Sequence, residues 1–83
     1  MPKLSTQHDK AFILFHTEGC HLCEQAQALI DSLAMEYTTQ DICDIESLAE
    51  QYGIRIPVLL RQQDNSELGW PFDIEQLTQF MGA

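Results

Sequence analysis

The chain has 83 residues, 45% of them apolar, and its 13 acidic residues outnumber 4 basic ones for a formal net charge of −9. This length fits one small domain, and the apolar fraction is too high for a disordered chain. The basic residues are too few and too scattered to neutralise phosphates, so nucleic acid and anionic membrane are not expected partners. No apolar run has the length of a membrane span or a secretory leader, and we therefore expect a soluble cytoplasmic protein. We also expect a monomer.

The beginning of the chain predicts a strand, a glycine turn and a helix. AFILFH at 11–16 is a continuous apolar run, which is typical of a strand buried on both faces. Gly19 marks a turn, and after it apolar residues recur at helical spacing with polar residues between them. The helix positions expected to face inward are Leu22, Ala26, Leu29, Ile30 and Leu33. A polar stretch at 1–10 is expected to be an N-terminal extension of a single domain that spans 1–83.

The middle of the chain predicts a weak strand, a short helix and a second buried strand. YTTQDI at 37–42 is β-branched and aromatic but polar, as in an edge strand. Asp44 can cap the following helix and Gly53 can end it. The apolar face of this helix consists of Leu48, Ala49 and Tyr52. IRIPVLL at 54–60 is typical of a loop that enters a strand at Pro57, because proline is tolerated at the first position of a strand.

The last third of the chain predicts a hairpin and a terminal helix. QQDNSE at 62–67 has turn chemistry, and ELGW at 67–70 supplies a short return strand. Asp73 and Gln76 can form a capping box at the start of the helix. Its inward positions are Ile74, Leu77, Phe80 and Met81. The order β-α-β-α-β-β-α predicts an α/β fold in which three helices cover both faces of a four-stranded mixed sheet.

Two cysteines lie three positions apart at the start of the first predicted helix. Positions i and i+3 share a helix face, so Cys20 and Cys23 can form a disulfide with little backbone movement. Cys20 falls beside free backbone N–H groups and the positive end of the helix dipole, where a thiolate is favoured. Cys23, one turn further in, should be less exposed. This asymmetry suits Cys20 as the nucleophile that attacks a disulfide and Cys23 as the resolving thiol.

Charged neighbours act on this pair in opposite directions. His21 lies between the cysteines and as a cation would favour the thiolate, so it is a candidate modulating residue. Glu18 and Glu24 oppose the thiolate, because nearby carboxylates disfavour it. The third cysteine, Cys43, lies in an acidic setting and is expected to be a bystander.

A paired cysteine motif has two other interpretations. Zinc also uses it, and a site could be assembled from His16, Cys20, Cys23 and Cys43. The chain has no second paired motif to complete such a site, and we expect no metal. Both cysteines could also be simple packing residues. A strand, a turn and a CxxC that opens a helix favour redox chemistry over both alternatives.

Three blocks together resemble the thioredoxin superfamily, and in particular its small glutaredoxin-like proteins. The blocks are FILFHTEGCHLCEQA, GIRIPVLL and ELGWPF before the last helix, so the resemblance runs from about Ala11 to the end. It implies the thioredoxin-like fold and a thiol–disulfide oxidoreductase with Cys20 as nucleophile and Cys23 as resolving thiol. It also implies a cis bond between Ile56 and Pro57 facing the cysteines, with the backbone before the proline pairing with a bound peptide or thiol. Taken alone, the residues favour the commoner trans bond.

The chain departs from glutaredoxins that use glutathione at two places. They usually carry a lysine three residues before the nucleophile, where this chain has Thr17. They also carry a Gly-Gly followed closely by an acidic residue, where this chain has Gly-Trp-Pro-Phe-Asp. The substrate groove that the resemblance implies consists of Ile56, Pro57, Gly69, Trp70 and Asp73. Trp70 would crowd this groove and Asp73 would repel an anion, so glutathione is disfavoured.

The expected partner is therefore a disulfide-containing protein or another low-molecular-weight thiol, with no cofactor and with the reductase unidentified. Two alternatives of other classes stay open. One is a non-catalytic binding module that keeps the thioredoxin fold and presents the groove between Pro57 and Trp70 to a partner protein. The other is a zinc or iron–sulfur carrier.

Overall fold

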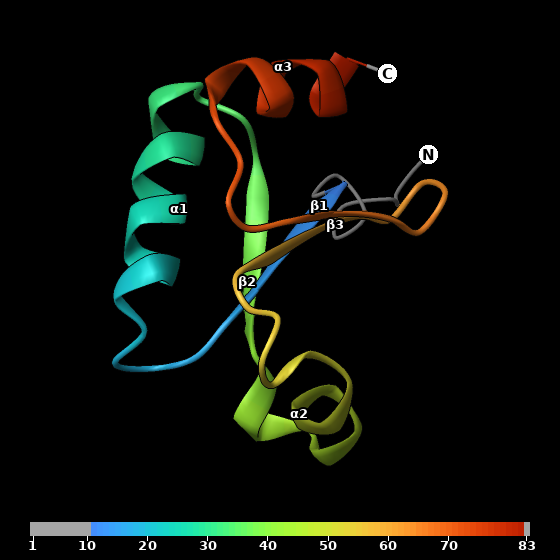
Figure 1. Cartoon of the computed structure of the whole chain (residues 1–83). Coiled ribbons are helices and arrows are strands. Elements are labelled where there is room, and N and C mark those ends of the chain that lie inside the picture. The colour runs from blue at the N-terminus through green and yellow to red at the C-terminus, as the bar shows by residue number, and fades with distance from the viewer. Residues whose placement is uncertain (1–10, 83) are drawn as a thin grey trace.

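The computed structural model describes residues 11–82, which form one mixed sheet with helices against it (Figure 1). The polar extension expected at 1–10 lies outside the described residues. The elements are β1 (Phe12–His16), α1 (His21–Ser32), β2 (Tyr37–Asp41), the 3-10 helix η2 (Ile42–Asp44), α2 (Glu46–Tyr52), β3 (Val58–Arg61), β4 (Ser66–Gly69) and α3 (Ile74–Gly82). Their order confirms the predicted one, with η2 added. In the described part of the chain, no helix combines the length and the apolar character needed to span a bilayer.

The four strands lie in the order β2-β1-β3-β4. β1 and β2 are parallel, which requires the crossover that α1 provides, while β3 is antiparallel to β1 and to β4. Phe15 near the end of β1 pairs with Val58, and Val58 also pairs with Gly69. The loops next to these three residues, 17–20, 53–57 and 70–72, therefore leave the sheet at one end, which we call the loop end. The opposite end holds the β3–β4 turn, and we call it the hairpin end.

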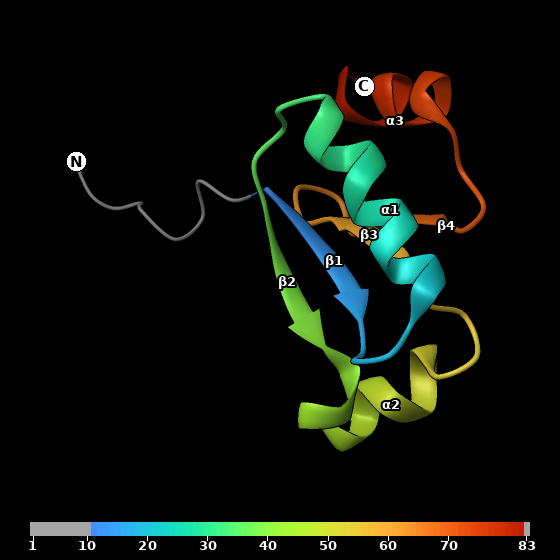
Figure 2. The same ribbon diagram turned by 90° about the vertical axis from the view of Figure 1, so that its left-hand side faces the viewer.

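Alternating side chains of the strands feed two apolar cores, because successive residues of a strand point to opposite faces of the sheet. The larger core lies beneath α1 and α3 and contains Leu14, Ala26, Ile30, Met35, Leu59, Phe72 and Leu77. The smaller core lies against α2 and contains Phe15, Ile42, Tyr52 and Val58. The helices therefore cover both faces, as predicted, with α1 and α3 together and α2 alone at the lower end of the sheet in Figures 1 and 2.

The predicted cap of the second helix was wrong. Asp44 was expected to cap it, but α2 begins only at Glu46, and Ile45 before it makes no side-chain capping bond. Asp41 accepts a hydrogen bond from the backbone N–H of Cys43 at 2.9 Å and so opens η2. The chain thus takes an extra turn that ends at Asp44, and the capping carboxylate lies three residues upstream.

Two residues that were expected to face inward are exposed. Leu22 is 46% exposed, because the buried stripe of α1 runs through Cys23, Ala26 and Ile30 instead. Ile74 is 39% exposed at the first residue of α3, ahead of the turn in which Leu77 is fully buried.

The residue that ends the second helix and the capping box that starts the last helix were predicted correctly. Gly53 follows the last residue of α2, with an ordinary right-handed backbone conformation. The capping box is formed as expected, because the Gln76 N–H donates to Asp73 Oδ1 at 2.8 Å and the Asp73 N–H donates to Gln76 Oε1 at 3.1 Å.

Candidate functional site

The two motif cysteines form a disulfide at the first turn of α1, with their Cα atoms 5.2 Å apart. Cys20 is the N-cap residue of α1, and its Sγ accepts a hydrogen bond from the Cys23 N–H at 3.1 Å. Cys23 is 3% exposed, whereas Cys20 is only half-buried. The predicted asymmetry is therefore present, with Cys20 as the cysteine that an incoming group can approach.

A tight turn delivers Cys20 to this position. β1 ends at His16, and Gly19 takes a left-handed backbone conformation with φ of +78°. Glycine adopts this conformation without the steric cost that a Cβ brings. Since nothing lies within 4 Å of the place a Cβ would occupy, Gly19 serves the backbone geometry rather than a close approach.

The loop before β3 carries the expected cis bond between Ile56 and Pro57. Pro57 is fully buried. The Trp70 N–H donates to the Pro57 carbonyl at 3.1 Å, and this hydrogen bond joins the loop before β3 to the segment after β4. The Ile56 N–H donates to the Tyr52 carbonyl at 3.1 Å. A substrate strand that pairs here would therefore meet a backbone N–H that already has a partner.

Four of the five predicted groove residues gather at the loop end. Gly69 ends β4 and pairs with Val58, beside Pro57, and Trp70 bonds to Pro57 directly. Asp73 is not brought to this group, because it caps α3, which lies level with the C-terminal end of α1 in both views (Figures 1 and 2). The disulfide lies at the other end of that helix.

The segment between β4 and α3 brings two aromatic rings into contact, and only part of this arrangement was predicted from the sequence. Trp70 is half-buried and its ring meets that of Phe72 edge-on, with centroids 5.1 Å apart. Phe72 is 5% exposed and belongs to the larger core, so only Trp70 forms part of the expected lip. A second cis bond, between Trp70 and Pro71, was not predicted. The Trp-Pro pair was the signal available for it.

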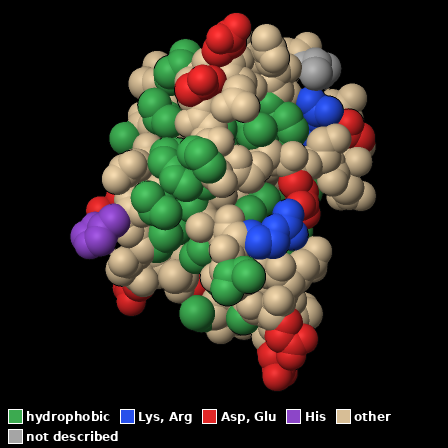
Figure 3. Space-filling model, viewed as in Figure 1, with side chains coloured by type: hydrophobic (Ala, Val, Ile, Leu, Met, Phe, Trp, Pro, Cys, Tyr) green, Lys and Arg blue, Asp and Glu red, His purple; other side chains and the backbone are tan. Residues whose placement is uncertain are grey.

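Exposed apolar side chains flank the site in the sequence. Leu22 between the cysteines is 46% exposed, and Ile54 three residues before Pro57 is fully exposed. Figure 3 shows hydrophobic side chains gathered over α1 and the segment that joins β4 to α3. The face that carries α1 is thus more apolar than the charge of the whole chain suggests.

The charged neighbours of the disulfide are all exposed to solvent. His21 Nδ1 lies 3.8 Å from Glu24 Oε1, and the two side chains are 89% and 70% exposed. Glu18 is exposed in the turn before Cys20. Interactions between exposed charges are weak and fall with added salt, so none of these groups locks the site into one charge state.

A polar cluster behind the Pro57 loop was missed in the sequence. Tyr52 donates to Glu67 Oε2 at 2.5 Å, and Arg55 donates to Glu67 Oε1 at 2.6 Å. Burial, together with the hydrogen bond to Glu67, raises the pKa of Tyr52 to about 12. The hydrogen bonds from Tyr52 and Arg55 hold the pKa of Glu67 below its ordinary value. These contacts tie the end of α2 and the loop before Pro57 to β4.

Cys43 lies beside the loop that leads to the disulfide. Its Sγ is 3.3 Å from Thr17 Oγ1, and it is exposed and unpaired with another cysteine. The backbone N–H of Cys43 holds the pKa of Asp41 below its ordinary value. Across residues 11–82 no three His, Cys, Asp or Glu side chains lie close enough to share a metal ion, so His16 and the three cysteines are not gathered into one site.

Comparison with known proteins places this geometry in a family. A family model described as a Glutaredoxin-like domain (DUF836) matches residues 11–82. The chain belongs to this glutaredoxin-like family. The X-ray structure of protein XcR50 from X. campestris is 37% identical to the glutaredoxin-like chain, with a TM-score of 0.76 over 87% of this chain and 96% of that chain. Protein Ne2328 from Nitrosomonas europaea, solved by NMR in solution, is 28% identical, with a TM-score of 0.73 over 86% and 89% of the two chains. No curated protein matches the chain.

These likenesses confirm the resemblance that the three sequence blocks carried. The glutaredoxin-like chain has a thioredoxin-like fold with a four-stranded mixed sheet and three helices. Its family and its bonded pair of Cys20 and Cys23 fit a redox role.

Proposed function

We propose that this protein is a cytoplasmic thiol–disulfide oxidoreductase that acts on the disulfide of a protein or of a low-molecular-weight thiol. The observation that carries the proposal is the unequal pair at the start of α1, in which Cys20 is approachable and Cys23 is buried. Disulfide exchange needs one thiolate that a substrate can reach and a second that reacts only within the protein.

The structure holds the pair in its oxidised form. In the reduced protein, the Cys20 thiolate attacks one sulfur of a substrate disulfide, forms a mixed disulfide and releases the first substrate thiolate. The Cys23 thiolate then attacks the Cys20 sulfur, closes the protein disulfide and releases the second substrate thiolate. The protein loses two electrons, the substrate gains two, and the protons of the cysteines pass through solvent to the released thiolates.

The position of Cys20 supports its role in the first step. The backbone N–H groups of the first turn of α1 carry partial positive charge, and one of them already bonds to its Sγ. A protonated His21 would add to this effect, and it is the modulating residue in our proposal. Ile56, Pro57, Gly69 and Trp70 form the floor on which the substrate lies, whereas Asp73 takes part in capping α3.

The proposal is tested by following the reduction of a neutral small disulfide by the reduced protein. Cys20→Ser should abolish the reaction, because no other approachable thiolate lies at the start of α1. Cys43→Ser removes a free, exposed thiol from a neighbouring loop and is the matched control, which should retain the full rate. Full activity in the Cys20→Ser protein would contradict the proposal.

A further inference from the structure

We propose that the site prefers disulfides that carry neutral or positively charged groups over disulfides that carry negative ones. This inference rests on the proposed function, since it names the substrate class of the same pair of cysteines. It starts from the charges next to Cys20. Glu18 lies two residues before it and Glu24 one helical turn after it, and both are exposed.

A second acidic group stands beside the loop that leads to Cys20. Thr17 contacts Cys43, whose N–H bonds to Asp41, and Asp44 follows next in η2. The pKa of Asp41 lies below its ordinary value, so this carboxylate is charged at neutral pH. Negative charge therefore approaches Cys20 both from its own turn and from the neighbouring η2.

No lysine or arginine of the described chain is placed to offset this charge, and His16, which interacts with Asp41, would offset part of it only when protonated. Arg55 and Arg61 are the lysine or arginine residues between 11 and 82. Arg55 is paired with Glu67 at 2.6 Å and lies over the Tyr52 ring. Arg61 lies at the hairpin end and is paired with Asp64. Even His21, when protonated, has Glu24 as its neighbour.

The field at the sulfur follows from this placement. Within residues 11–82, a substrate that approaches Cys20 passes carboxylates without meeting an unpaired lysine or arginine. A group on the substrate with positive charge is drawn in and one with negative charge is repelled, and the effect is strongest when few salt ions screen it. Leu22, which is 46% exposed between the cysteines, offers an apolar contact to an uncharged substrate body, so we expect discrimination by charge and not by polarity.

The test compares three small disulfides: cystamine, which is cationic, 2-hydroxyethyl disulfide, which is neutral, and glutathione disulfide, which is anionic. The rate of each with the reduced protein is divided by its rate with the uncharged dithiol dithiothreitol, which corrects for the reactivity of the disulfide itself. We expect the normalised rates to fall in the order cationic, neutral, anionic. At about 0.01 M salt the first and last should differ at least about tenfold. At about 1 M salt, where the Debye length falls from about 30 Å to about 3 Å, this ratio should collapse.

A matched pair of variants locates the effect. Glu18→Gln combined with Glu24→Gln should lower the cationic-to-anionic ratio several-fold at low salt. Glu36→Gln removes an exposed carboxylate near the C-terminal end of α1, a helix length from the disulfide, and should leave the ratio unchanged. Equal normalised rates at low salt, or a ratio that ignores salt, would overturn this inference while leaving the oxidoreductase intact. Failure of all three disulfides to react would instead contradict the proposed function.

Discussion

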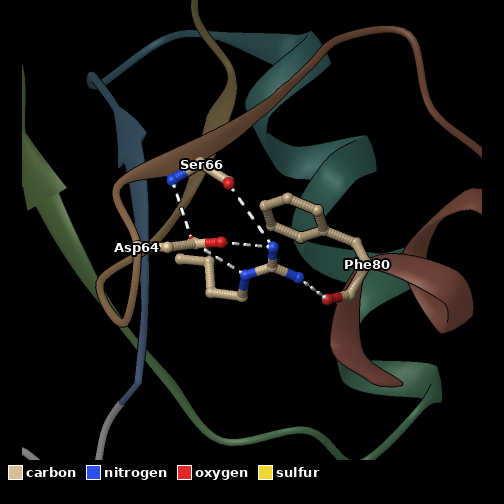
Figure 4. Close-up of polar contacts among 4 residues, drawn as sticks. Asp64, Ser66 and Phe80 are labelled. Atoms are coloured by element: carbon tan, nitrogen blue, oxygen red, sulfur yellow. Dashed lines mark hydrogen bonds and ion pairs between the residues drawn. The ribbon is translucent and has the colours of Figure 1, made fainter. Parts of the chain in front are cut away.

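The two ends of the sheet use the same kinds of residue for different purposes. At the loop end, Arg55, Glu67 and Tyr52 form a cluster beneath the loop that carries Pro57. At the hairpin end, Arg61 donates to both carboxylate oxygens of Asp64, at 3.0 and 2.8 Å, and to the Phe80 carbonyl at 2.7 Å (Figure 4). The first cluster supports a loop beside the disulfide, whereas the second fastens the last helix to the sheet.

Aromatic contacts reinforce the cluster at the hairpin end. The Arg61 guanidinium lies 4.8 Å from the centre of the Phe80 ring, and the rings of Phe80 and Phe12 are 5.9 Å apart. A groove of about 420 Å³ lies beside this cluster, lined by Arg61, Ser66, Leu68, Gln76, Gln79 and Phe80. Its one cation already donates to Asp64, Ser66 and Phe80, so it serves the fold and is not available to an anion. The comparison teaches that similar clusters serve different ends, since one supports the loop that carries Pro57 and the other joins the last helix to the sheet.

The largest effect is expected from breaking the core under α3. Leu77 is fully buried between α3, α1 and the sheet, and Leu77→Ala should lower the free energy of unfolding by about 2–5 kcal/mol. Chemical denaturation measures this loss. The rate of disulfide exchange per folded molecule should not change, because α3 is remote from Cys20.

Ile74→Ala is the control for this variant, since Ile74 is on the same helix but 39% exposed. Its effect should be far smaller than that of Leu77→Ala. A loss of exchange rate in folded Leu77→Ala protein would show that the last helix takes part in the chemistry.

The next effect is expected at the arginine of the hairpin end. Arg61→Met keeps an unbranched apolar stem but removes every donor, so the Phe80 carbonyl loses the Arg61 donor and Asp64 keeps the Ser66 N–H. Thermal unfolding should show a midpoint several degrees lower. Arg61→Lys keeps the charge but not the planar guanidinium, so its unfolding midpoint should lie between those of the wild type and Arg61→Met.

The pairing of Arg61 with Asp64 also predicts how stability changes in acid. The hydrogen bond from Arg61 holds the pKa of Asp64 below its ordinary value of 3.8. The contribution of the pair is therefore present above pH 3.8 and is lost as the pH falls further. Wild-type protein should lose this contribution on acidification, and an equal loss in Arg61→Met would contradict the assignment.

At the loop end, Gly19→Ala should cost about 1 kcal/mol, because alanine is strained at a φ of +78°. It should also lower the exchange rate, since the turn positions Cys20. Gly82→Ala in α3 is the matched control, with an ordinary backbone and open space at the added carbon. A Gly19→Ala protein with unchanged stability would show that the turn rearranges freely.

The smallest effect concerns two tyrosines at opposite ends. The pKa of Tyr52 is raised to about 12 by burial and the bond to Glu67, and that of Tyr37 is raised less, by burial and a bond to Asp31. A raised pKa contributes stability below pH 10 that is lost as the pH rises toward the folded value. Tyr52→Phe should therefore remove more of the alkaline loss of stability than Tyr37→Phe, as measured by denaturation at pH 9 to 12. An equal effect of Tyr52→Phe and Tyr37→Phe would contradict a larger pKa shift at Tyr52 than at Tyr37.

Much of this molecule was predictable because its signals are local. An apolar run marked β1, helical spacing marked α1, and a carboxylate three residues before a glutamine marked the start of α3. The place of Cys20 at the helix start and the burial of Cys23 followed from the same local pattern. The cis bond before Pro57 came from resemblance and not from the residues themselves.

The parts that were not predictable depend on contacts between distant residues. Tyr52 and Arg55 reach Glu67 across 15 and 12 positions, and Arg61 reaches Phe80 across 19. The resemblance placed Asp73 in the groove, whereas in the structure it caps α3, a helix that lies level with the C-terminal end of α1 (Figure 2). Only the packing of the whole chain fixes such positions.

Trapping the intermediate tests the central claim most directly. Cys23→Ser protein, reduced and then mixed with a small disulfide, should stop at the first step, because no resolving thiol closes the reaction. Mass spectrometry of the digested protein should then find one substrate thiol bonded to Cys20. Finding the adduct on Cys43 instead, or no adduct at all, would contradict the account of Cys20 as the attacking sulfur.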